Sequence, residues 1–127
     1  MRSWKARLAL CFVLAALGAA VVAPQASAAC AGGWVCLFNG PNWETEDRPF
    51  RDSGLQNLPA GLNDIISSVT NNTNRWAILY QHSGGWGTFF CIAPEIRRSM
   101  WANPFNNEAS SIQIFPNGTI PPCSGSL

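Results

Sequence analysis

The chain has 127 residues, with eight Lys and Arg residues, seven Asp and Glu residues and a formal net charge of +1. Proteins that bind nucleic acid or anionic membrane surfaces need basic residues gathered on one face. Beyond residue 7 the chain has only five basic residues, all Arg, which are too few for such a face, so the composition argues against both kinds of partner.

Residues 1–28 have the features of a secretory signal peptide. A basic stretch at residues 2–7 precedes an apolar run from Leu8 to Ala23, and Ala26-Ser27-Ala28 forms a small-residue cleavage site. The apolar run is shorter than the roughly 20 residues of a membrane-spanning helix, which disfavours a membrane anchor. We therefore expect a secreted, extracellular domain of residues 29–127, free of the membrane once the signal is cleaved. Its five Arg and seven acidic residues give it a net charge of −2.

The expected mature chain contains an even number of cysteines, namely Cys30, Cys36, Cys91 and Cys123. In an oxidising compartment such a set predicts two disulfides, and four cysteines allow three pairings. The short gap between Cys30 and Cys36 favours a local bond there, which leaves Cys91 with Cys123. A zinc site is disfavoured because the cysteines form no Cys-x-x-Cys pair and the single histidine, His82, is distant in sequence.

An internal repeat of about 43 residues organises the mature chain, with copies at about 35–73 and 76–116. Its order and spacing are too consistent for chance, and the second copy has one extra residue at Gly84-Gly85. The matching segments are Leu37-Phe38 with Leu79-Tyr80, Trp43 with Trp86, and Leu62–Val69 with Phe105–Ile112.

The predicted elements are short strands, taken in chain order as residues 35–38, 76–80, 88–92 and 111–115. They are rich in β-branched and aromatic residues, and Gly, Pro and Asn cluster between them. We expect an all-β domain in which two similar units pack their apolar faces together as a sandwich. The sequence also predicts a largely aromatic core drawn from Trp34, Phe38, Trp43, Phe50, Trp76, Tyr80, Trp86, Phe89, Phe90, Trp101, Phe105 and Phe115.

The repeated pattern resembles a known fold family. Two aromatic residues, five positions apart in the first copy and six in the second, are followed in each copy by Asn/Asp-Asn/Asp-x-x-Ser/Thr-Ser, and this pattern resembles the βγ-crystallin domain of two Greek-key motifs. The stretch from Cys36-Leu37-Phe38 to Leu79-Tyr80-Gln81-His82 is more closely similar to the secreted βγ-crystallin-like proteins of peptidase inhibitor family 36, which includes the streptomyces-type metalloproteinase inhibitor. The family's hairpin glycine is replaced by Thr45 in the first copy.

The resemblance implies inhibition of an extracellular, thermolysin-like metalloproteinase. The family's reactive bond joins a cysteine to an aliphatic residue, which matches Cys91-Ile92 in a loop that continues through Ala93-Pro94. Ile92 would follow the scissile bond, where such enzymes accept a large aliphatic side chain, and a rigid loop would lower the entropic cost of binding. The alternative is that Phe89-Phe90-Cys91-Ile92 is a buried strand and Cys91 only a staple.

The resemblance also implies two possible calcium sites, each with ligands from both copies. The candidate oxygen donors are Asn63, Asp64, the backbone of Ile65, and Ser67 in the first copy, and Asn106, Asn107, the backbone of Glu108, and Ser110 in the second. Each copy supplies one carboxylate, so we expect weak binding, on the order of 0.1 to 1 mM. The alternative is that these residues only form the hydrogen bonds of two turns.

The sequence offers little basis for an enzyme. His82 lies in a glycine-rich turn, and no nucleophile is paired with a base in any recognisable motif. We expect no required cofactor, and we expect a monomer because the two copies bury their apolar faces against each other.

Overall fold

The computed structural model describes residues 30–43 and 46–123, so the expected signal peptide at 1–28 lies outside the described residues. Eight strands follow one another along this part of the chain: β1 (Trp34–Phe38), β2 (Glu46–Phe50), β3 (Gly54–Asn57), β4 (Ser68–Asn72), β5 (Ala77–His82), β6 (Trp86–Ile92), β7 (Ile96–Ser99) and β8 (Ser111–Ile114). Within the described ranges, no helix has the length and apolar character needed to cross a membrane.

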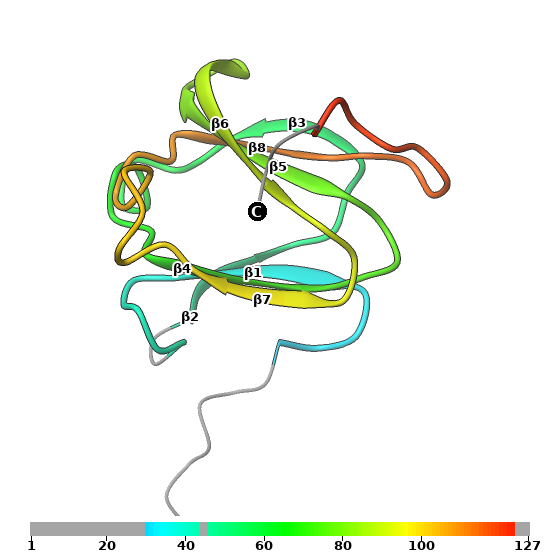
Figure 1. The fold of residues 1–127 in the computed structure, drawn as a ribbon, viewed down its shortest axis with the longest axis horizontal. Helices are drawn as coiled ribbons and strands as arrows, with labels where there is room; N and C mark the ends of the chain where they lie inside the picture. The colour runs from blue at the N-terminus through cyan, green and yellow to red at the C-terminus, as the bar shows by residue number, and fades with distance from the viewer. Residues whose placement is uncertain (1–29, 44–45, 124–127) are drawn as a thin grey trace, which may run out of the picture.

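The strands form two four-stranded antiparallel sheets that lie one above the other (Figure 1). Sheet A has the strand order β2-β1-β4-β7 and sheet B the order β3-β8-β5-β6. The predicted all-β sandwich is therefore confirmed. Each copy also gives one strand to the other copy's sheet, because β3 of the first copy pairs with β8 and β7 of the second pairs with β4.

Four strands escaped the sequence analysis, and each has a local reason. β2 contains Pro49, β3 begins at a glycine, and β4 and β7 are mostly polar or charged. β2 and β3 are outer strands of their sheets, where a missing ladder donor or a weak strand former is tolerated. Pairing partners, rather than local propensity, determine these four strands.

The core between the sheets is aliphatic, which corrects the expected aromatic core. Alternate residues of β1 and β8 point inward, among them Val35, Leu37, Ile112 and Ile114, as a strand's two-residue period requires. In this cluster the aromatic members are Phe50 and Phe105. Trp86, Phe89 and Trp101 were wrongly assigned to the core, since they are 73%, 46% and 64% exposed.

A second, smaller cluster lies on the outer face of sheet A. Cys30, Cys36 and Phe38 are buried there, and Trp34 and Trp43 pack against them. Cys36 and Phe38 alternate along β1 with the inward residues, so they must point away from the main core. The Cys30–Cys36 disulfide thus fixes the first described residues on this outer face.

The extra residue of the second copy lies in the β5–β6 hairpin. The pairing of β5 with β6 shifts between Tyr80 and His82, and Gly84, Gly85 and Gly87 all have positive φ. A side chain at Gly87 would place its Cβ 2.7 Å from the His82 ring, so glycine is needed there for space as well as for its backbone angle. The inserted residue is therefore absorbed in a bulged hairpin.

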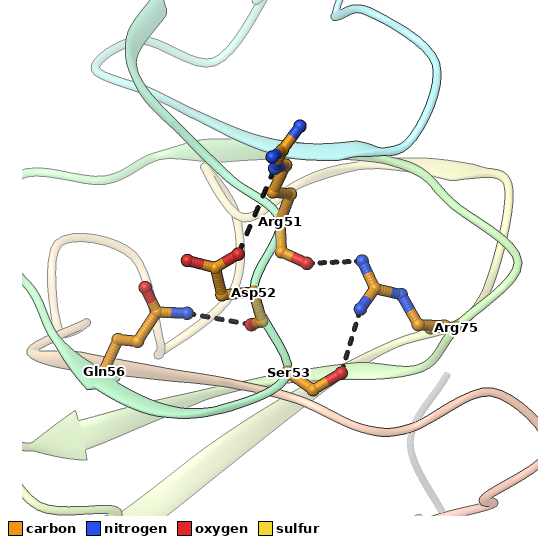
Figure 2. Close-up of polar contacts among 5 residues, drawn as sticks. All are labelled: Arg51, Asp52, Ser53, Gln56 and Arg75. Carbon is orange, nitrogen blue, oxygen red and sulfur yellow. Dashed lines mark hydrogen bonds and ion pairs between the residues drawn. The ribbon is translucent and has the colours of Figure 1, made fainter.

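Among the connections that pass from one sheet to the other, β2–β3 and β6–β7 occupy equivalent places in the two copies, and both lead from the second strand of a copy to its third. Figure 2 shows the first of these, where the guanidinium of Arg75 donates to the carbonyl of Arg51 and to the Ser53 hydroxyl. Arg75 belongs to the segment between β4 and β5, which links the two copies. This linker therefore fastens the first crossover from outside.

Candidate functional site

The two Asn/Asp-Ser corners, residues 63–67 and 106–110, lie against each other and exchange equivalent hydrogen bonds. The Asp64 amide donates to the Ala109 carbonyl at 3.0 Å, and the Asn107 amide donates to the Ile66 carbonyl at 3.1 Å. Asp64 and Asn107 have left-handed backbones with φ of 60° and 59°. Aspartate and asparagine are among the residues that tolerate this conformation best, which explains their place in both corners.

The side chains of the corners also cross between the copies. The Ser67 hydroxyl donates to Asn107 Oδ1 at 3.0 Å, and the Ser110 hydroxyl donates to Asp64 Oδ1 at 3.3 Å. Asn63 Nδ2 donates to Asp64 Oδ2 within the first corner. These bonds hold the two corners together, as the alternative interpretation of the motif requires.

The oxygen donors in the two corners differ in their suitability for a hard cation. The first pairing offers the carboxylate of Asp64 beside the Ser110 hydroxyl, whereas the second offers only neutral oxygens from Asn107 and Ser67. The buried Oδ1 of Asn106 has no hydrogen-bond partner in the structure. Carboxylate, hydroxyl and amide oxygens are calcium ligands, so the Asp64 corner fits calcium and the Asn107 corner fits it less well.

The remaining candidate donors are less available. Glu108 accepts a hydrogen bond from Gln81 Nε2 at 3.1 Å, so its carboxylate is engaged with β5. The side chain of Ile65 packs against the main core and contains no oxygen. Its backbone carbonyl is therefore the only ligand that it can offer. No cluster of three or more His, Cys, Asp or Glu side chains suitable for a metal occurs among the residues that the structure describes.

Cys91 and Ile92 are the last two residues of strand β6, which corrects the expectation that they lie in a loop. Cys91 is opposite Ile78 and Ile92 is opposite Ala77 in β5, and the turn begins only at Pro94. Ile92 has an exposed fraction of 0% and belongs to the main core. β6 is nevertheless an outer strand of sheet B, so no strand of the described residues pairs with its far edge.

The Cys91 side chain points away from the core and is tied to Cys123. The disulfide spans 32 residues and joins β6 to the segment that follows β8. With Cys30–Cys36 this is the pairing that the short first gap favours. Residues 91 and 123 therefore remain linked even if the chain is cut next to Cys91.

The sequence analysis missed a buried polar contact at the start of the β6–β7 crossover, made by Asn71 of β4. Asn71, at the end of β4, is 1% exposed and its Nδ2 donates to the carbonyls of Arg75 at 2.7 Å, Ala93 at 3.0 Å and Ile92 at 3.4 Å. Its Oδ1 accepts from the amide and the hydroxyl of Thr73. The repeat contained a sign of this burial. The position equivalent to Asn71 in the second copy is the apolar Ile114, which suggests an inward-facing position in both copies.

The fold is shared with several solved βγ-crystallin structures. A domain from Flavobacterium johnsoniae is 28% identical and has a TM-score of 0.54, with 68% of this chain and 98% of that one covered. The calcium-bound βγ-crystallin domain of the Abundant Perithecial Protein of Neurospora crassa is 16% identical with a TM-score of 0.58, over 71% and 97%. A βγ-crystallin from an archaeon is 21% identical with a TM-score of 0.52, over 67% and 100%. The last two likenesses concern the fold alone.

Sequence comparison identifies the family. A comparison with curated proteins gave no match. The model of peptidase inhibitor family I36 matches residues 23–92, which is more than half of the chain and ends at the last residue of β6. The chain therefore belongs to peptidase inhibitor family I36, a family of inhibitors and not of enzymes.

Proposed function

We propose that this protein is secreted and inhibits a thermolysin-like metalloproteinase through the end of β6, at the Cys91–Ile92 bond. The observation that carries the proposal is the placement of this bond at the end of an outer strand, with Cys91 tied by a disulfide to Cys123. Proteases bind substrates as extended strands, and the free edge of an outer strand offers the backbone groups for such pairing. Family membership and the two disulfides support an extracellular protease as the partner.

The burial of Ile92 has a kinetic consequence for this proposal. A protease pocket that accepts the Ile92 side chain must draw it out of the core, which costs about 1.5 to 3 kcal/mol. Such a cost slows association by about 10- to 150-fold relative to an exposed loop. We therefore expect slow-binding inhibition, with an association rate constant below the usual range of about 10⁵ to 10⁷ M⁻¹s⁻¹.

Inhibition assays with a small protease panel test the proposal. The purified protein should lower the rate of substrate hydrolysis by thermolysin-like enzymes and leave that of trypsin-like and subtilisin-like enzymes unchanged. With thermolysin, the progress curves of product formation should bend as inhibition develops. Amino-terminal sequencing of the complex should show a trace of chain that begins at Ile92. Rapid inhibition without any such product would place the contact elsewhere on the molecule.

A variant at Ile92 must be read together with its stability. Ile92→Asp would place a charge in the core and unfold the domain whatever its inhibitory role. Ile92→Ala removes most of the side chain and should weaken inhibition more than the equally buried control Ile112→Ala, provided that both variants fold by circular dichroism. Equal inhibition by the two variants would count against contact through Ile92.

We also propose weak calcium binding at the Asp64 corner as a second candidate function. The supporting observation is the contact between the Asp64 carboxylate and the Ser110 hydroxyl across the two copies. Calcium at millimolar concentration should raise the melting temperature, and Asp64→Asn should remove more of that rise than Asn107→Ala does. If titration calorimetry gives no heat and the melting temperature is unchanged, the corners serve the fold only.

A further inference from the structure

The two sheet crossovers are equivalent in the repeat but are fastened in different ways. The β2–β3 crossover is held by the guanidinium of Arg75, in contacts that lie among exposed residues (Figure 2). The β6–β7 crossover is held by the amide of Asn71, which is 1% exposed. The second crossover, which directly follows the proposed inhibitory bond, is therefore the one with a buried polar clamp.

The fold itself does not require an amide at position 71. Asn71 is paired with Val35 and Ile96 in sheet A, and its counterpart Ile114 is paired with Gly54 and Ala77 in sheet B. Ile114 is fully buried in the main core, so an apolar side chain satisfies this position in the second copy. Burial of an amide is unfavourable unless its groups are hydrogen-bonded, so Asn71 must gain its place through the bonds it makes.

Each polar group of Asn71 has a partner suited to it. Oδ1 accepts from the Thr73 amide at 3.1 Å and from the Thr73 hydroxyl at 2.7 Å, which fixes the orientation of the side chain. The two Nδ2 hydrogens then face the carbonyls of Arg75, Ile92 and Ala93. In addition, the Glu95 amide donates to the Thr73 carbonyl at 3.1 Å. Residues 92 and 93 are thus held to β4, and residue 95 to the linker, independently of the chain before them.

We infer that Asn71 is a positioning residue for inhibition, holding the Ile92 side of the bond in place while the Cys91–Cys123 disulfide holds the other. The inference rests on the proposed function. Hydrolysis by the protease would add one water, break the bond between the Cys91 carbonyl carbon and the Ile92 nitrogen, and leave a carboxylate on Cys91 and an amine on Ile92. With both ends held together, the amine attacks the same carbonyl in the enzyme's site, expels water and restores the peptide bond.

The test compares Asn71→Leu with the unaltered protein in the presence of thermolysin. Intact and cut chains are distinguished by mass, since the cut form is heavier by one water while its disulfide is intact. The unaltered protein should remain mostly intact at equilibrium, and its isolated cut form should return to the intact form when thermolysin is added. Loss of two hydrogen bonds to the Ile92 side should raise the equilibrium ratio of cut to intact chain by about tenfold.

Two further variants keep the test decisive. Thr73→Val keeps the shape of Thr73 but removes the hydroxyl that orients Asn71, so it should shift the ratio in the same direction and decides the matter if Asn71→Leu does not fold. Arg75→Ala releases only the side-chain bonds at the other crossover and should leave the ratio unchanged. A purely structural role would change melting temperature without changing the ratio.

The outcomes separate this inference from the proposed function. If the unaltered protein neither inhibits thermolysin nor is cut before Ile92, the proposed function fails and this role fails with it. If it inhibits and is cut there, but Asn71→Leu and Thr73→Val show the same ratio of cut to intact chain as the unaltered protein, the role of Asn71 is refuted while the inhibitory site stands.

Discussion

The outer faces of the two sheets differ although the repeat makes their cores alike. On sheet A, Trp43 packs beside the Cys30–Cys36 disulfide, donates to the Val69 carbonyl at 3.2 Å and has the Arg97 guanidinium 4.5 Å from its ring. Its counterpart on sheet B, Trp86, is 73% exposed. The repeat therefore constrains the core and the corners, whereas the outer faces have diverged, and the more open one belongs to the sheet that carries Cys91.

The largest expected difference between the faces concerns their disulfides. Cys91 and Cys123 are separated by 32 residues and Cys30 and Cys36 by 6. On the chain-entropy model, Cys91→Ala with Cys123→Ala should lower the free energy of unfolding by about 3 to 4 kcal/mol, and Cys30→Ala with Cys36→Ala by about 2 kcal/mol. Urea denaturation of both double variants measures this. The reverse order would mean that packing on sheet A outweighs loop closure.

The paired tryptophans provide the next test. Trp43→Ala should lower the free energy of unfolding by about 2 to 3 kcal/mol, because it removes a half-buried ring and a hydrogen bond. Trp86→Ala should change it by less than about 0.5 kcal/mol. Residue 43 has a positive φ of 56°. Tryptophan and alanine both carry a Cβ, so the strain of this backbone angle is similar before and after the substitution. Equal losses in a urea titration would refute the contrast between the faces.

A smaller effect is expected from the arginine that covers Trp43. Arg97→Ala should destabilise the domain by about 0.5 to 1 kcal/mol through loss of the cation–π contact. Arg98→Ala, at the neighbouring exposed position, is the control and should have almost no effect. Combining Arg97→Ala with Trp43→Ala should add little to the tryptophan variant alone, and a fully additive loss would show that the two side chains are not coupled.

The smallest effect concerns alkaline pH and Tyr80, whose counterpart on sheet A is Phe38. Burial raises the pKa of Tyr80 above its ordinary value of 10.0, so the folded state holds this proton more tightly than the unfolded state. The resulting stabilisation is complete below pH 10.0 and is lost as the pH rises through the folded-state pKa. Tyr80→Phe should flatten the fall of melting temperature between about pH 9.5 and 11. An unchanged slope would mean that other groups cause it.

Much of the fold could be predicted because the repeat is a global signal. The matching of Leu62–Val69 with Phe105–Ile112 located both corners, and the structure brings them together. The exchange of β3 and β7 between sheets could not be predicted in the same way, because a repeat shows which segments are equivalent and not which copy each one pairs with.

The candidate site was less predictable, for a reason that the residues make clear. Cys91-Ile92 was found through its resemblance to a family motif, but a motif does not reveal that Ile92 is in the core. Asn71 was missed because polar residues in short segments usually indicate turns. Its inward position follows from Val69, two residues earlier in β4 and fully buried, and becomes evident only once that strand is known.

The burial of Asn71 also affects how the protein can be produced. Asn71-Asn72-Thr73 is an acceptor sequence for asparagine-linked glycosylation, and so is Asn117-Gly118-Thr119. A glycan at Asn117 would project from an exposed turn, whereas a glycan at Asn71 would occupy the place of the core and of three carbonyl contacts. A eukaryotic secretory host that modifies Asn71 before folding would thus yield chains that cannot fold, and a bacterial periplasm is the compartment that supplies disulfides without this modification.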